Sequence, residues 1–419
     1  MGLIQDTDRF VQYRYRVSEF IIMVGGENIK LEPMQIVGMT ISEDFETDIF
    51  PVFKVQVTIE PEVYIKMVKN KDKVKFKVRV QKYSTDQSTG KKSLYTDYIN
   101  DTFTVFLDDT DSNYDEKLTK QKRKTDGIGD KDISMHLLNE KIDLFLFKEE
   151  YVVNIKKRIN FIPKSINMIT TIAYIMTESG ISGALVSPLD NRKTYSPLML
   201  PALNTFKLLQ YLDYNFGFYK NGALIYFGLD RPYILNYKKG CTAWSGGEWK
   251  ETVFIILESS NEHNKMASAI IRGGEQKYYI NAQRKDVNAT NASISNNAIG
   301  GSDAYVINAD QQSVNTVASG AKTRGGAAQT RVINDTQNEF IGQTFAAQQA
   351  ASSTIITVSV TNVDLAAFTP NKDTTFIFED SIANSQYKGH YHLANGYYKF
   401  IKEGEDFTVE VTNTYKIAN

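Results

Sequence analysis

The chain has a single cysteine, Cys241, and four histidines among its 419 residues. One cysteine excludes an internal disulfide and any metal site built from paired thiols. The formal net charge is −1, which argues against binding of nucleic acid by bulk positive charge. Long hydrophobic runs are also missing, because Phe20–Val24 and Val253–Leu257 have only the length of strands. We therefore expect no membrane segment and, from the first residues, no secretory signal.

The segment Asp286–Ser352 lacks Leu, Met, Pro, Cys, His and Trp, and is rich in Asn, Ala, Ser, Gln, Thr and Gly. Such a composition buries too little apolar surface to offset the entropy of ordering a chain. Strand-like sequence stands on both sides. We interpret residues 286–352 as a low-complexity insertion into a β-rich domain, with a helical pattern in Asn334–Ala351.

Residues 1–110 are expected to form a compact β domain, a barrel or a sandwich. Apolar and polar residues alternate in several short stretches, as in strands with one buried face. Pro61 stands where the first turn of a helix tolerates proline. In the clearest strand, one side consists of Val74, Phe76, Val78 and Val80, and the other of Lys73, Lys75, Lys77 and Arg79.

Residues 111–235 are expected to form a linker and a mixed α/β middle domain. The linker Asp108–Lys131 is acidic and then basic, which is typical of a solvated loop. Ile142–Phe147 and Tyr151–Ile155 are strand candidates. A helix is expected to begin after Ser165 as its cap and to stop at Gly180.

A local unit closes the middle domain. Asn204 is a candidate N-cap for a helix that Gly217 ends. We expect Phe218-Tyr219 to enter a strand and Asn221-Gly222 to make a tight turn into Ala223–Phe227.

The last region, residues 236–285 and 353–419, is expected to be a second β domain that the insertion splits. Its later strand candidates are Thr374–Phe378, Tyr397–Ile401 and Phe407–Val411, and the turn at Gly404 joins the last two. The predicted fold is therefore mainly β, with an α+β middle domain.

Two groups of residues imitate metal sites. Asp109–Asp115 resembles the start of a calcium loop, but Tyr114 and Lys120 stand where such a loop needs Gly and Glu. His390 and His392 are two positions apart on one strand face and lack an apparent third ligand. We predict no metal and no cofactor.

Candidates for catalysis are equally incomplete. Cys241 and His263 have no group that would orient them as a nucleophile and a base. Glu43, Asp44, Glu46 and Asp48 include possible general acids, but no companion motif selects a pair, and an acidic surface loop is the commoner structure. We predict that the protein is not an enzyme.

Two patterns suggest binding surfaces. The basic row Lys73, Lys75, Lys77 and Arg79 would place charges about 6–7 Å apart, facing nucleic acid or an acidic row of a neighbouring subunit. A solvated face that protects an edge strand is the plainer interpretation. The aromatic run is a sugar platform in one interpretation and core or subunit interface in the other; its members are Tyr211, Tyr214, Phe216, Phe218 and Tyr219.

The order of three of these features along the chain is similar to that of a known family. The strand entry Phe50-Pro51-Val52-Phe53, the helix Asn204–Leu212 running into Phe216–Tyr219, and the split β region occur in that order. In outline this resembles the baseplate hub protein of contractile-tail bacteriophages and the hub portion of type VI secretion spikes.

The resemblance implies a homotrimer in which each chain carries two tube-like β-barrel domains, the second of them discontinuous. Three chains would then present six similar units, which match a hexameric tail tube above and a central spike below. The implied partners are the tail tube or a distal tail protein, a separate spike protein, other baseplate proteins and tape-measure protein, with DNA in passage. The protein would be assembled in the host cytoplasm and located in the virion tail baseplate.

The function expected from the sequence is thus a structural hub, and the alternative is a tail-associated glycan- or receptor-binding module. A tail-attached hydrolase is a third hypothesis, which the lack of a catalytic constellation disfavours. The candidate interface residues are Phe50, Phe53, Lys73, Lys75, Lys77, Arg79, Phe376 and Phe378.

Overall fold

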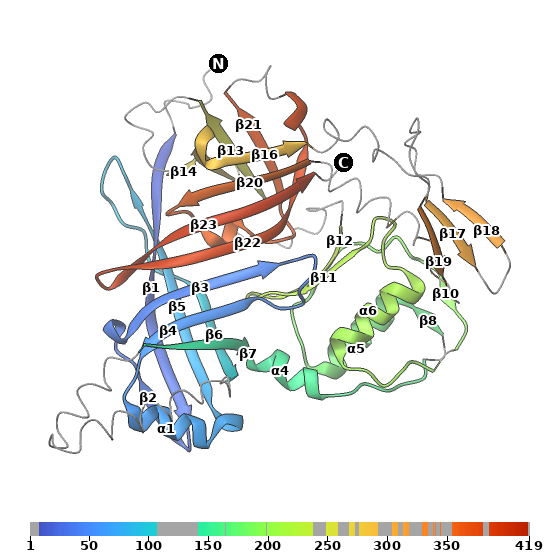
Figure 1. Cartoon of the computed structure of the whole chain (residues 1–419), viewed down its shortest axis with the longest axis horizontal. Coiled ribbons are helices and arrows are strands. Elements are labelled where there is room, and N and C mark those ends of the chain that lie inside the picture. The colour runs from blue at the N-terminus through green and yellow to red at the C-terminus, as the bar shows by residue number, and fades with distance from the viewer. Residues whose placement is uncertain are drawn as a thin grey trace.

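The computed structural model describes most of the chain as one large sheet with a smaller helical unit beside it (Figure 1). The described residues are 8–106, 141–163, 165–197, 199–237, 249–258, 268–272, 276–291, 304–308, 313–317, 329–333, 338, 340, 344, 354–379 and 385–417. The calcium-like run Asp109–Asp115, Cys241, His263 and most of Asn334–Ala351 lie outside them.

The main sheet has 15 strands. They are β1 (Arg9–Val24), β2 (Glu27–Lys30), β3 (Ile36–Asp44), β4 (Val52–Thr58), β5 (Lys75–Asp86), β6 (Thr96–Phe106), β7 (Lys141–Lys148), β13 (Glu251–Leu257), β14 (Ser268–Ile271), β15 (Lys277–Gln283), β16 (Val287–Asn291), β20 (Thr354–Thr361), β21 (Asp373–Phe378), β22 (His390–Glu403) and β23 (Asp406–Ile417).

Eleven of these strands close into a barrel, in the order β14-β15-β13-β21-β22-β3-β4-β7-β6-β5-β1 and back to β14. Strand β23 pairs with both β22 and β1, so it connects two strands of the eleven-stranded barrel that are not neighbours in it. The pairings therefore contain two smaller closed circuits, which share β1, β22 and β23. Closing a sheet on itself removes exposed strand edges.

The first circuit is β1-β5-β6-β7-β4-β3-β22-β23, and the second is β1-β14-β15-β13-β21-β22-β23. Two features differ from the expected boundaries. β7 lies beyond residue 110, yet it pairs between β4 and β6. β16 lies inside residues 286–352, yet it pairs with β20 in the main sheet. Whether the circuits are two copies of one tube-like domain stays a prediction.

Strand β5 shows why these sequences form this sheet. Phe76, Val78 and Val80 are fully buried, while Lys75 and Lys77 between them are exposed, as the alternation predicts. Lys73 is just outside the strand, in the short 3-10 helix η2 (Lys71–Lys73). Between β4 and β5, helix α1 (Pro61–Lys69) begins with Pro61, as expected.

The helical unit contains α4 (Glu149–Lys156), α5 (Met168–Ser179) and α6 (Thr205–Phe216). Two small sheets accompany them: β8 (Ile166–Asn167) with β10 (Thr194–Tyr195), and β11 (Ala223–Phe227) and β9 (Leu185–Val186) on either side of β12 (Pro232–Asn236). In Figure 1 the unit lies to the lower right of the barrel. A separate sheet of β17 (Ala304–Asn308), β18 (Ser313–Val317) and β19 (Gln329–Ile333) lies further right.

Helix α6 follows its sequence signals closely. The side chain of Asn204 accepts a hydrogen bond of 3.0 Å from the Lys207 amide, which caps the first turn. Gly217 ends the helix with φ of +71°. A side chain at Gly217 would overlap Asn338, whose amide donates to the carbonyls of Asp213 at 3.0 Å and Tyr214 at 3.2 Å. Asn338, within the expected insertion, thus helps to satisfy the end of α6.

Three local predictions in this unit are wrong. Tyr151–Ile155 lies within helix α4 rather than in a strand. Helix α5 is capped by Asn167 instead of Ser165, although it does stop at Gly180. The hairpin is formed by β11 and β12 across Gly228–Arg231, so Phe218-Tyr219 is not a strand. For Tyr151 and Phe218, burial in the core of the helical unit accompanies the difference, whereas the cap of α5 differs through a local bond from the Ile169 amide to Asn167 Oδ1.

Candidate subunit interface

Three of the aromatic interface candidates are buried inside this chain. Phe53 on β4 packs edge-on against Phe103, with ring centroids 5.5 Å apart. Phe376 on β21 stacks on Phe254 at 5.0 Å, and Phe378 lies beside Tyr387. The core of this chain therefore covers these three side chains, and any part that they play in an interface stays a prediction.

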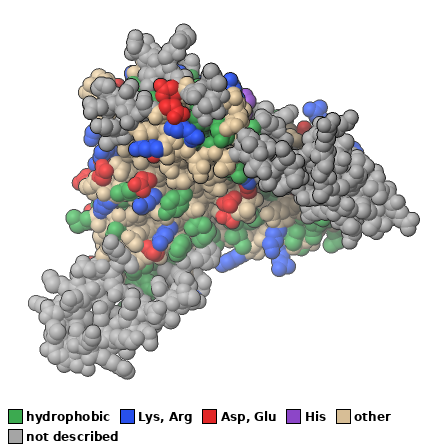
Figure 2. Space-filling model, turned by 45° about the horizontal axis from the view of Figure 1, so that its top comes forward, with side chains coloured by type: hydrophobic (Ala, Val, Ile, Leu, Met, Phe, Trp, Pro, Cys, Tyr) green, Lys and Arg blue, Asp and Glu red, His purple; other side chains and the backbone are tan. Residues whose placement is uncertain are grey.

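The basic row on β5 is paired with acidic groups of the same chain. Lys77 Nζ lies 2.9 Å from a carboxylate oxygen of Glu19 on β1, and Arg79 Nε lies 2.9 Å from Asp97 on β6. Lys75 pairs with Glu149 at the start of α4. On the face drawn in Figure 2, basic and acidic side chains are likewise interspersed. These pairs are exposed, so each contributes little to stability, but they reduce the net positive charge of the row.

Phe50 is the joint between the barrel and the helical unit. Its ring contacts Phe206 of α6, with centroids 4.6 Å apart, and lies within 6.0 Å of the rings of Tyr151 and Phe227. Phe206 and Phe227 also meet edge to face at 4.5 Å. Edge-to-face aromatic clusters stabilise beyond the area that they bury. This predicted interface residue therefore makes a partly buried contact within the chain, and any contact with a second chain stays a prediction.

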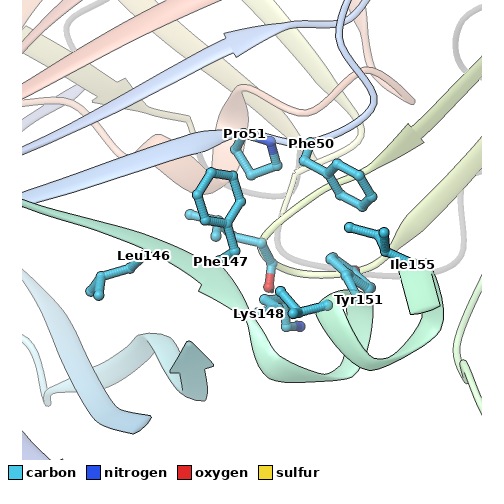
Figure 3. Close-up of a pocket in the computed structure, with 9 residues that line it drawn as sticks. Phe50, Pro51, Leu146, Phe147, Lys148, Tyr151 and Ile155 are labelled. Atoms are coloured by element: carbon cyan, nitrogen blue, oxygen red, sulfur yellow. Dashed lines mark hydrogen bonds between the residues drawn. The ribbon is translucent and has the colours of Figure 1, made fainter. Parts of the chain in front are cut away.

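A shallow apolar pocket opens beside this joint (Figure 3). It lies where the entry to β4 and the end of β7 meet α4, and its wall includes Phe50, Pro51, Phe147 and Ile155. Lys148 at its edge is held by Asp101 at 2.6 Å and by the Leu229 carbonyl at 3.0 Å. The pocket therefore presents apolar surface, with its one lining cation already paired.

The aromatic run from Tyr211 to Tyr219 does not form a platform. Phe216, Phe218 and Tyr219 are buried in the core of the helical unit. The Tyr219 hydroxyl donates to the carbonyls of Ser187 and Ile234, at 2.9 Å each. Only Tyr214 of the run is well exposed. The core interpretation is the one that the structure supports.

A polar cavity of about 440 Å³ lies between the barrel and α6. Glu46 on its wall accepts a hydrogen bond from the Tyr237 hydroxyl and pairs with Lys416 Nζ at 2.5 Å, while His392 Nε2 lies 4.0 Å away. Burial opposes ionisation of Glu46, but these donors lower its pKa to about 2. Glu46 is thus an internally paired anion and not a free acid/base group.

The neighbouring Glu43 has the opposite environment. Its carboxyl group lies between β3 and the β11–β12 hairpin, where the Tyr226 hydroxyl is 3.4 Å from Oε1. Desolvation, followed by repulsion from Asp230, raises the pKa of Glu43 from 4.5 to about 8. A neutral Glu43 fits this contact between the barrel and the helical unit.

This gives a prediction for pH. The folded chain holds a proton on Glu43 that the unfolded chain releases, because the folded pKa of about 8 exceeds the ordinary 4.5. The resulting stabilisation is complete below about pH 4.5 and is lost as the pH rises through 8, by on the order of 1–3 kcal/mol. Urea unfolding at about pH 6 and about pH 9 measures it. Glu43→Gln should make the free energy of unfolding less dependent on pH in this range. An equal loss of stability in the unchanged protein and in the variant would show that Glu43 is not responsible.

The remaining sequence candidates do not assemble into a site. Among the residues that the structure describes, no three His, Cys, Asp or Glu side chains come together as a set that could hold a metal ion. His392 is buried against the Tyr237 ring, and His390 is exposed. Within the described ranges, none of the helices is long and apolar enough to span a membrane.

Sequence reasoning missed one polar cluster. Lys82 and Asp364 form a buried ion pair of 2.5 Å, and Trp249 Nε1 donates to the same carboxylate at 2.9 Å. A signal was present, because Lys82 is in phase with Phe76, Val78 and Val80 on the inward side of β5. A lysine on a buried face requires a partner, and the sequence does not indicate which carboxylate supplies it.

Comparison with known proteins gives one match over nearly the whole chain. A family model described as Bacteriophage PBS1 gene 109 protein matches residues 7–417. A comparison with curated proteins gives no match.

Similar solved structures share little sequence with this chain. The tail protein from Neisseria meningitidis MC58 is 8% identical, with a TM-score of 0.48 and 96% of each chain covered. The 43 kDa tail protein of prophage MuSo2 from Shewanella oneidensis is 12% identical, with a TM-score of 0.45, and the match covers 94% of this chain and 96% of that one. A chain of the Francisella PdpA-VgrG complex is 8% identical, with a TM-score of 0.48, covering 100% of this chain and 54% of that one.

With TM-scores below 0.5, these likenesses carry no argument about the role of this chain. The family match stands independently of them, and it confirms that the resemblance drawn from the sequence pointed to a bacteriophage protein. The chain belongs to the family of the Bacteriophage PBS1 gene 109 protein.

Proposed function

We propose that this protein is the structural hub of a phage tail baseplate, a homotrimeric ring that adapts the hexameric tail tube to a separate central spike. The observation that carries the proposal is the pairing pattern of the main sheet. One chain contains two closed strand circuits that share β1, β22 and β23. Three such chains would present six circuits around one axis, which relates a threefold ring to a sixfold tube.

The role proposed is geometric and not catalytic. Two acidic groups with shifted pKa values take part in internal contacts: Glu43 with Tyr226, and Glu46 with Lys416 and Tyr237. The exposed cations of β5 are likewise paired within the chain. A rigid ring of this kind would join the tube or a distal tail protein to the spike, contact other baseplate proteins, and line the path for tape-measure protein and DNA.

Light scattering on the purified protein at micromolar concentration tests the trimer. The proposal predicts a particle of three times the 47.4 kDa chain mass. Because a hub can depend on its neighbours for assembly, the same measurement is made after co-expression with the adjacent tail proteins. A particle of single-chain mass in both preparations would contradict the homotrimer.

The alternative is a tail-associated glycan- or receptor-binding module, which rests on the aromatic richness of the chain and on the polar insertion. The burial of Phe216, Phe218 and Tyr219 removes these three side chains from any aromatic platform. Saturable binding on a glycan array would nevertheless favour it over the hub.

A further inference from the structure

Helix α5 presents a face with little charge to solvent. Glu178, next to the last position, is the one charged residue among its twelve. The inward side, with Met168, Ile172 and Ile175, is buried in the helical unit. The outward side carries Ile169, Ala173 and Tyr174 together with Thr170, Thr177 and Glu178, all exposed. The large apolar side chains of Ile169 and Tyr174 on this exposed face are candidates for a contact with another surface.

The apolar surface continues beyond the helix. The Phe161 ring packs against the Tyr174 ring with centroids 4.4 Å apart, and Ile162 beside it is exposed. We call Ile162, Ile169, Ala173 and Tyr174 the α5 patch. The Glu178 carbonyl at the end of the helix accepts a hydrogen bond from Lys157. Glu178 places an acidic side chain at one end of the patch, and the Lys157 ammonium lies beside that end.

The same chain carries a complementary projection. Leu94, near the tip of the β5–β6 hairpin, is 88% exposed, the highest value among the exposed large apolar side chains of the described residues. Tyr95 beside it is also exposed, and Lys91 and Lys92 precede it. Lys92 Nζ lies over the Tyr83 ring at 5.1 Å, which helps to hold the tip. Two apolar side chains next to two cations match a patch that is apolar with an acid at its end.

The two features lie on opposite sides of the molecule. In Figure 1 the β5–β6 hairpin projects at the upper left and α5 lies at the lower right. They cannot meet within one chain, but they can meet between neighbours in a head-to-tail ring, where each contact joins two different surfaces.

We propose that the β5–β6 tip of one copy packs against the α5 patch of the next copy, with Leu94 against Ile169 and Tyr174. This inference rests on the proposed homotrimer and names the surfaces that build it. Lys91 or Lys92 then approaches Glu178 of the neighbour. The contact would cover both the exposed apolar side chains of α5 and the exposed Leu94.

Cysteine cross-linking tests the contact directly. In a Cys241→Ser background, Leu94→Cys and Ile169→Cys are combined and oxidised. We expect disulfide-linked dimers and trimers on a non-reducing gel, because contacting side chains can reach disulfide geometry. The matched control combines Ile169→Cys with Val68→Cys, a partly exposed apolar position on α1. A ladder for the first pair alone supports the proposal, and equal ladders or none for both pairs overturn it.

A second variant separates this contact from the trimer itself. Leu94→Asp is expected to weaken trimer association at least about tenfold at unchanged thermal stability, because it places an anion in an apolar contact near Glu178. Val68→Asp should leave association unchanged. If the protein is a trimer by light scattering but shows neither the cross-link nor the Leu94→Asp effect, this contact is wrong and the proposed hub survives. A particle of single-chain mass under all conditions removes both.

Discussion

Lys82→Met is expected to lower the free energy of unfolding by about 3–5 kcal/mol, because it leaves a buried carboxylate without its cation. Asp364 is fully buried and the Lys82 side chain nearly so. The pair links β5 to the loop between β20 and β21, in which Asp364 Oδ1 also accepts from the Ala366 amide at 3.0 Å. The Tyr15 hydroxyl holds the same loop through the Val363 carbonyl and the Leu365 amide. This cluster therefore connects strands of the two circuits.

A double variant distinguishes the ion pair from simple packing. Lys82→Met with Asp364→Asn removes both charges while the asparagine oxygen can still accept from Trp249, so most of the lost stability should return. Urea unfolding at neutral pH measures all three variants. If Lys82→Met alone lowers the free energy of unfolding by less than about 1 kcal/mol, water or another group compensates the charge of Asp364. The ion pair would then not stabilise the connection between β5 and the loop that joins β20 to β21.

Phe206→Ala should lower the free energy of unfolding by a comparable amount, about 3–5 kcal/mol, because it opens a cavity in the aromatic cluster of Phe50, Phe206 and Phe227. Phe206 is buried and contacts Phe50 and Phe227 at 4.6 and 4.5 Å between ring centroids. We expect the loss to be local, because the ring lies between the helical unit and the barrel. Hydrogen exchange should therefore accelerate in α4 and α6 more than in β1 and β5.

Two controls accompany this variant. Phe206→Leu keeps most of the volume and should cost less than about 1.5 kcal/mol. Tyr214→Ala, at an exposed position on the same helix, should change stability by no more than about 0.5 kcal/mol. Uniform acceleration of exchange across the barrel after Phe206→Ala would show that the two parts unfold as one unit, and it would contradict the role of a local joint.

The sequence predicted elements whose signals are local. The caps of α6 at Asn204 and Gly217, the proline start of α1 and the alternation along β5 all depend on neighbours within a few residues. The positive φ of Gly404 likewise allows the predicted turn between β22 and β23. Each of these features depends on residues close together in the chain, so the amino-acid sequence was sufficient to predict it.

Long-range pairing was not predictable in the same way. Tyr151–Ile155 has a strand-like composition, and it becomes helical where Tyr151 packs against Phe227. Nothing in Val287–Asn291 indicates its pairing with β20, which lies more than 60 residues away. The burial of Phe53 and Phe376 has a related cause: alternation shows that they share a face with other apolar residues, and this is the pattern of a core as much as of an interface.

Electron cryomicroscopy of the assembled protein tests most directly the claim that three chains form a ring of six strand circuits. One reconstruction shows both the number of chains and the number of circuits around the axis. The account predicts three copies in a closed ring, with the β1-β5-β6-β7-β4-β3-β22-β23 circuit and the β1-β14-β15-β13-β21-β22-β23 circuit alternating so that six units surround a channel. A ring of six copies or an open chain of copies would contradict it.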